Sequence, residues 1–436
     1  MYEKMKKIVC LGTKVMEKEL QQKDVQKSNM LLIVLCWLVY TCSYIGKLGY
    51  NANITQIETL YGITHAEAGM VSTFFFFAYG VGQIVNGLFC KKYNIRYVVF
   101  GSLLLSGSMN WLVGLVNNFV VLKFFWLING AALSVLWTSL IRLLSETLTQ
   151  KHMSRAVIVM GTTVATGTFL VYGMSALFVV VLNFRWILYL TGALLPTISV
   201  IWLFFLPVLV RKSTEINLER TKTSEENSKD SDSNLQNGGK AVWLSLLPAF
   251  VVFSCYAVVN NLVKDGLTTW VPMILKELYQ LPDYVSIFLT LFLPVLAIFG
   301  VTVVVFLNKK IKNFVVLGAL LLLSATLLIG AVILFLPKNV FVITLCCFAL
   351  VSCLMSGVNN IVTSMVPLYW KDKINSGMVA GILNGFCYVG STISSYGLGA
   401  VADKWGWSAV FWLLLILTCV VGVIGLASVF LKLKRK

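Results

Sequence analysis

Two lysines inside long hydrophobic segments are the residues of this sequence best placed to do chemistry. Lys47 lies about two-thirds of the way along the first apolar segment, and Lys264 lies similarly along the seventh. An ammonium group at that depth in a membrane is costly unless a partner compensates its charge. Each lysine could snorkel to the interface or form a fixed ion pair. Because the two positions are equivalent in a repeated sequence, we favour a site that binds a phosphate or carboxylate.

Other polar and aromatic residues fall near these lysines. Tyrosine can donate a hydrogen bond to an anionic oxygen, although helix packing or an interfacial belt are alternative roles. Asp265 is a carboxylate deep in a span, where it could tune the charge of the site, contact a substrate hydroxyl, carry a coupling proton or face a neighbouring helix. The candidate substrate-binding residues are Lys47, Lys264, Tyr44, Tyr40, Tyr79, Asn261, Asp265, Tyr388 and Asn384.

The composition requires a membrane to position these residues. Of the 436 residues, 58% are hydrophobic and only 12% are charged, which is more apolar surface than a soluble domain can hide. The sequence therefore predicts an all-α integral membrane protein with twelve transmembrane helices. We expect them at about 31–54, 67–90, 97–116, 119–147, 155–182, 186–210, 242–276, 284–307, 313–336, 339–367, 375–401 and 407–431.

The net charge of +17 reports topology rather than a nucleic-acid partner. Of the 35 Lys and Arg residues, 28 fall in the tails, alternate loops and central linker that we assign to the cytoplasm. This distribution follows the positive-inside rule and predicts that both termini are cytoplasmic. The ten cysteines are scattered and the two histidines are isolated, so we expect no disulfide, metal or cofactor site.

The predicted helices divide six and six around a polar stretch. We expect a cytoplasmic tail at 1–30, bundles at 31–210 and 242–431, a cytoplasmic linker at 211–241 and a basic tail at 432–436. The bundles repeat: Lys47-Leu48-Gly49 matches Lys264-Asp265-Gly266 at an offset of 217 positions, and Thr166-Gly167 matches Asn384-Gly385 at 218. A common offset predicts two pseudo-symmetric six-helix bundles.

Several segments resemble those of the organophosphate:phosphate antiporters of the major facilitator superfamily, which include the glycerol-3-phosphate and hexose-phosphate transporters. The seventh-helix segment is the most specific and ends in the Trp-x-Pro expected of that family. The segments are Tyr44-Ile45-Gly46-Lys47, Ala78-Tyr79-Gly80, Asn260 to Pro272 and Gly385-Phe386-Cys387-Tyr388-Val389-Gly390. Two arginines bind phosphate in the family, and Lys47 and Lys264 occupy the matching positions, so the positive charge is kept while the bidentate geometry is not.

The resemblance implies a monomeric secondary transporter in the cell membrane that exchanges a small organic anion for inorganic phosphate by alternating access. A carboxylate or sugar-acid transporter and a transporter-like sensor of a phosphorylated sugar are the alternatives. An enzyme is not expected, because the sequence shows no paired carboxylates, metal cluster or nucleophile–base pair in a plausible arrangement.

Overall fold

The computed structural model is almost entirely helical in the part of the chain that it describes, which comprises residues 2–89, 92–148, 150–221, 240–338, 340–370, 374 and 376–434. No strand occurs among those residues. The first half contains α1 (Tyr2–Ala52), α2 (Ile54–Tyr61), α3 (His65–Phe89), α4 (Ile95–Leu115), α5 (Phe119–Leu133), α6 (Leu136–Thr147), α7 (Gln150–Gly161), α8 (Thr163–Val181) and α9 (Arg185–Thr221). The second half contains α10 (Lys240–Tyr279), α11 (Asp283–Leu289), α12 (Phe292–Asn308), α13 (Phe314–Phe335), α14 (Phe341–Asn360), α15 (Val366–Tyr369) and α16 (Ser376–Lys434), with a 3₁₀ turn at Leu336–Lys338 and a π-helical turn at Ile361–Met365.

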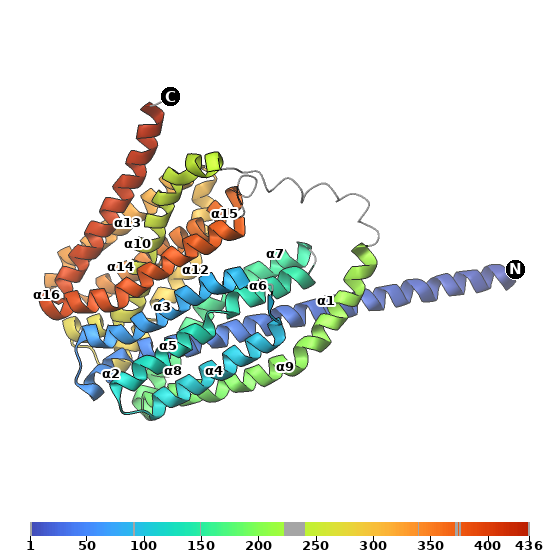
Figure 1. Cartoon of the computed structure of the whole chain (residues 1–436), viewed down its shortest axis with the longest axis horizontal. Coiled ribbons are helices and arrows are strands. Elements are labelled where there is room, and N and C mark those ends of the chain that lie inside the picture. Colours follow the sequence, from blue (N-terminus) through green and yellow to red (C-terminus); the bar gives the residue numbers. More distant parts are fainter. Residues whose placement is uncertain are drawn as a thin grey trace.

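Eleven segments of the described chain are long and apolar enough to span a membrane. The last of them, Met378–Phe430, is 53 residues long and covers two crossings. Its helix bends sharply at Gly406, whose φ of 76° lies in a region that favours glycine, and Figure 1 shows the two arms of α16 on either side of the bend. Ten single crossings and one double crossing give twelve, which confirms the predicted fold class.

Equivalent helices of the two halves begin in the same way. The side chain of Asn94 accepts a hydrogen bond from a backbone N–H in the first turn of α4, and Asn313 does the same for α13. Asparagine is a favoured N-cap because its side-chain oxygen satisfies an N–H group that lacks a partner in the helix. The duplicated pattern read from the sequence therefore recurs in local structure.

The two halves form separate groups of helices that pack together near α2 and the bend of α16, as Figure 1 shows. Close packing there depends on small residues, because α3 and α16 cross with little room between their backbones. A Cβ atom at Gly69 would overlap the carbonyl oxygen of Ser395, and one at Gly399 would lie 2.7 Å from the carbonyl oxygen of His65. We call this end of the molecule the α2 end.

Some helices extend beyond the predicted limits. Helix α1 begins at Tyr2 and includes most of the predicted tail, because Lys, Glu and Gln are good helix formers. Helix α9 continues to Thr221 and α10 begins at Lys240, so both helices enter the predicted linker, and residues 222–239 lie outside the described residues. The assignment of the tails and the linker to the cytoplasm stays a prediction.

Candidate substrate-binding site

The ammonium group of Lys47 is enclosed by aromatic rings from three helices. Lys47 is 7% exposed, and its Nζ lies 4.6 Å from the ring centroid of Tyr79 on α3 and 5.4 Å from that of Tyr388 on α16. Rings within about 6 Å attract a cation through their negative faces. The full set, which we call the aromatic cage, is Tyr44, Phe75, Phe76, Tyr79 and Tyr388.

The aromatic cage leaves the charge of Lys47 without an acceptor. In the part of the chain that the structure describes, no hydrogen bond or ion pair to its Nζ is found, and the rings are its contacts. Lys47 still interacts electrostatically with the carboxylate of Asp265 and the ammonium group of Lys264. A buried cation with no acceptor in direct contact is suited to receive an anion, since ring faces stabilise a charge much less than water does.

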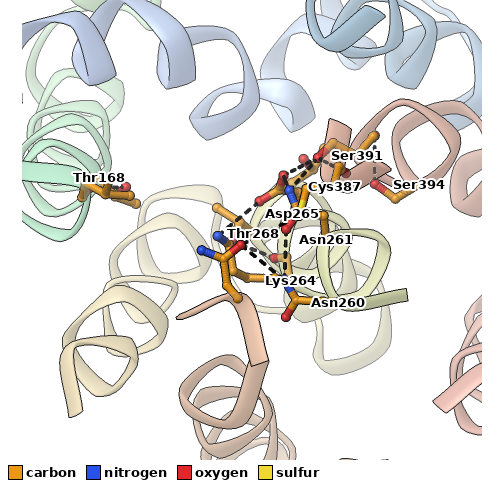
Figure 2. A network of polar contacts seen from close by, with 12 residues as sticks. Thr168, Asn260, Asn261, Lys264, Asp265, Thr268, Cys387, Ser391 and Ser394 are labelled. Carbon is orange, nitrogen blue, oxygen red and sulfur yellow. Dashed lines mark hydrogen bonds and ion pairs between the residues drawn. The ribbon is translucent and has the colours of Figure 1, made fainter. Parts of the chain in front are cut away.

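The second half contributes a polar network around Asp265, which Figure 2 shows. One carboxylate oxygen of Asp265, Oδ2, accepts a hydrogen bond from Ser391 Oγ at 2.5 Å and one from Asn261 Nδ2 at 3.4 Å. Asn261 Nδ2 also donates to Ser391 Oγ at 3.1 Å, and Asn261 Oδ1 accepts from Asn260. These bonds join α10 to α16 and fix Asp265 within the second half.

Lys264 and Asp265 form a loose pair. Adjacent helical residues point about 100° apart, so a face-to-face contact is not expected from the sequence. The flexible stem of Lys264 nevertheless brings its Nζ to 3.9 Å from Asp265 Oδ1. The side chains are 25% and 18% exposed, respectively, so both groups remain partly accessible. The pair leaves Oδ1 without the close donors that engage Oδ2.

The structure brings most of the predicted residues together around these two centres. Tyr40 lies one layer behind, because its ring packs on Tyr44 at 5.4 Å and on Trp137 at 4.8 Å. Asn384 is half-buried in α16, and no hydrogen bond connects it to the other candidates among the described residues. Gly80 lets the helices carrying Tyr79 and Tyr388 approach, since a Cβ there would lie 2.9 Å from the Cβ of Tyr388. Substrate binding by these residues stays a prediction.

Two phenylalanines of the aromatic cage were not predicted from the sequence. Phe75 and Phe76 lie one turn before Tyr79 on α3 and face Lys47 at 6.0 and 5.4 Å. Their spacing from Tyr79 places all three rings on adjoining faces of one helix. That spacing was visible in the sequence, but a run of phenylalanines in a membrane helix more often faces lipid.

A further polar cluster at the α2 end was also missed. His65 Nδ1 lies 2.7 Å from Glu58 Oε1, and His65 Nε2 lies 3.3 Å from Glu277 Oε1 of the other half. Trp407 donates from Nε1 to Glu277 Oε2 at 2.7 Å. Asp403 accepts hydrogen bonds from the first backbone N–H groups of α3, at 3.0 and 2.8 Å. The contacts of His65 with Glu277 and of Asp403 with α3 connect the two halves at the α2 end.

A family model described as Major Facilitator Superfamily matches residues 36–395. The chain belongs to this superfamily. It is 19% identical over 414 residues to a probable hexose phosphate transport protein of Chlamydia pneumoniae, covering 90% of each chain. It is also 26% identical over 99 residues to the membrane sensor protein UhpC of Salmonella typhimurium, a match that covers 23% of this chain and 22% of the sensor.

Solved structures share the fold at low sequence identity. A bacterial homologue of the human lysosomal transporter Spinster, in an inward-facing and occupied conformation, superposes with a TM-score of 0.73. The two are 13% identical, and the match covers 93% of this chain and 98% of the other. The superfamily member described here is therefore a multi-pass membrane transporter rather than an enzyme, and its relatives confirm the resemblance to the organophosphate:phosphate antiporters.

Proposed function

We propose that this transporter exchanges a small organic anion, a sugar phosphate or another organophosphate, for inorganic phosphate by alternating access. The observation that carries the proposal is the amino group of Lys47, which is buried among aromatic rings and has no hydrogen-bond or ion-pair acceptor among the described residues. Lys264 adds a second positive charge close enough to act on the first. The hexose phosphate transport relative supports this class of substrate.

The two lysines explain why exchange is favoured over the return of an empty carrier. When the halves rock and the site loses water, unneutralised positive charges repel each other and lose their hydration. A bound anion removes the repulsion and offsets the desolvation cost. A loaded carrier therefore reorients faster than an empty one, which couples the outward movement of one anion to the inward movement of another.

In the proposed orientation, both termini lie in the cytoplasm. The protein is a monomer in the lipid bilayer of the plasma membrane. The α2 end then faces outward, and its contacts between the halves close the external side. In this state the anion reaches Lys47 and Lys264 from the cytoplasm. Rocking of the halves breaks the α2-end contacts and releases the anion outside.

Exchange in liposomes tests the proposal. Purified protein in vesicles preloaded with phosphate is expected to take up labelled phosphate in a saturable manner, and Lys47→Ala and Lys264→Ala are expected to abolish uptake. Lys338→Ala is the matched control, because the Nζ of Lys338 also lies over an aromatic ring, at 4.8 Å from Phe335, but outside the site. Net uptake of anion into empty vesicles at a comparable rate would contradict exchange.

The alternatives predict other results in the same assay. A carboxylate transporter would take up sugar acids without exchanging phosphate. A sensor would bind sugar phosphate and transport none, and the partial match to a membrane sensor protein gives this reading its support. A sugar phosphate that stabilises the purified protein thermally but is not exchanged would favour the sensor.

A further inference from the structure

The candidate site contains three charges and not only two. Lys47 interacts electrostatically with both Lys264 and Asp265, so all three groups act on one another across the two halves. Asp265 also interacts electrostatically with the phenol groups of Tyr44 and Tyr388, whose rings belong to the aromatic cage. With all three groups ionised, the site carries a net charge of +1.

Asp265 is built into the site and is not a surface charge. Its Oδ2 accepts one hydrogen bond from the hydroxyl of Ser391 and one from the side-chain amide of Asn261. Ser391 is 0% exposed and Asn261 is 6% exposed. Both partners donate, as an ionised carboxylate requires of its hydrogen-bond partners. The remaining oxygen, Oδ1, has Lys264 as its neighbour at 3.9 Å, which is too distant for a strong hydrogen bond. Oδ1 is therefore able to accept a hydrogen bond from a ligand.

Charge balance decides which anions the site can enclose. A single negative charge brings the sum of site and ligand to zero, whereas a double negative charge leaves −1 in a space that loses water as the halves close. An uncompensated charge in such a space is strongly disfavoured, because a buried ion loses its hydration. The site therefore discriminates between anions that differ by one proton.

We propose that the site selects hydroxyl-bearing monoanions, with the anionic group at Lys47 and a ligand hydroxyl donating to Asp265 Oδ1. Sugar acids and the singly charged forms of phosphate and sugar phosphates belong to this class. The inference rests on the proposed function, since it specifies the charge and polarity of the anion that is exchanged. Asp265 is the residue that determines this specificity, and Ser391 and Asn261 position it.

Two probes of known charge distinguish a preference for monoanions from a preference for dianions. Gluconate is a monoanion between pH 5.5 and pH 8, whereas glucose 6-phosphate changes from mainly monoanion to dianion over that range. Each probe is added as a competitor of the exchange of trace labelled phosphate, and its inhibition constant is followed with pH. We expect inhibition by glucose 6-phosphate to weaken roughly 50- to 100-fold between pH 5.5 and pH 8, as its monoanion disappears with a pKa near 6. The inhibition constant of gluconate is expected to stay constant within about threefold, because the charge of gluconate does not change over this range.

The variant Asp265→Asn raises the net charge of the site to +2 while keeping the shape of the side chain. Its preference is expected to reverse, so that glucose 6-phosphate inhibits better at pH 8 than at pH 5.5. Asp283→Asn is the matched control. Asp283 Oδ1 lies 2.9 Å from the Nζ of Lys276, and this ion pair is outside the site. The control variant is therefore expected to keep the wild-type pH profile.

The outcomes are distinguishable from those of the proposed function. Wild-type inhibition by glucose 6-phosphate that strengthens as pH rises would overturn the monoanion proposal, even if Asp265→Asn fails to fold. A parallel loss of gluconate inhibition at pH 8 would assign the effect to titration of the protein and overturn it as well. Absence of phosphate exchange by the wild type would instead refute the proposed exchange. Thermal stabilisation of purified protein by the same two probes at both pH values then tests the charge preference directly.

Discussion

Asn51 and Thr269 join the two halves of the molecule by a hydrogen bond of 2.8 Å from the Asn51 amide to the Thr269 hydroxyl. They lie 218 positions apart, one more than the offset of 217 that relates Lys47 to Lys264 on the same two helices. Residues at nearly equivalent positions of two pseudo-symmetric halves meet only close to the axis that relates the halves. Tyr172 adds a second bond beside it, from its hydroxyl to the Thr268 carbonyl oxygen at 2.5 Å. Closure at the α2 end therefore begins one helical turn beyond Lys47 and Lys264.

The close approach of α3 and α16 is expected to be required for closure of the α2 end. In Gly69→Ala the new methyl group overlaps the carbonyl oxygen of Ser395, so closed packing is destabilised by about 1–3 kcal/mol. We expect a cysteine placed at Thr269, in a chain without native cysteines, to react faster with an impermeant maleimide. Gly101→Ala is the control, because a Cβ there meets no atom within 4 Å. Equal labelling of the two variants would contradict this role of Gly69.

The charge of Lys47 is expected to destabilise the protein in the absence of ligand. Lys47→Met keeps the apolar stem inside the aromatic cage and removes the buried charge, so the free energy of unfolding should rise by about 1–2 kcal/mol. Thermal unfolding in detergent measures this change as a higher midpoint. Phosphate should raise the midpoint of the wild type and of Lys47→Arg and leave that of Lys47→Met unchanged. A phosphate response in Lys47→Met would show that the anion binds elsewhere.

The rings of the aromatic cage, rather than its hydroxyl groups, are expected to matter most for Lys47. Tyr79 and Tyr388 pack on each other at 4.8 Å and both face its ammonium group. Tyr388→Phe keeps the ring and should change the half-saturation concentration for phosphate little. Tyr388→Leu removes a cation–π contact of about 0.5–2 kcal/mol and should weaken exchange correspondingly. A large effect of Tyr388→Phe would instead favour a hydrogen bond from tyrosine to the anion.

The pair of His65 and Glu277 is expected to hold the α2 end closed. Labelling of cysteine at Thr269 in His65→Ala, Glu277→Gln and the double variant gives a double-mutant cycle for closure. Because His65 Nε2 contacts Glu277 across the two halves, the coupling should be about 0.5–3 kcal/mol. Asp283→Asn removes an ion pair within one half and should leave the labelling rate unchanged. Additive effects of the two single variants would show that the contact does not contribute to closure.

Local properties of the sequence were enough to predict the spans, the duplication and the two central lysines. A run of about twenty apolar residues can lie in a bilayer only as a helix, so the limits of most spans could be read directly. The positions of Lys47 and Lys264 followed from the same runs, since a charge inside an apolar stretch is visible without any knowledge of packing. The bend at Gly406 was likewise anticipated as the break between the last two predicted helices.

Contacts between helices could not be read in this way. The aromatic cage takes residues from α1, α3 and α16, and Ser391 meets Asp265 only because α16 packs on α10. Helical periodicity gives the face on which a side chain lies, but the register of one helix against another depends on close packing at positions such as Gly69 and Gly80. The sequence by itself therefore determined which charged residues lie within the membrane spans. Only the tertiary structure decided that Lys47 meets rings, that Asp265 joins the site, and that His65 reaches Glu277 across the two halves.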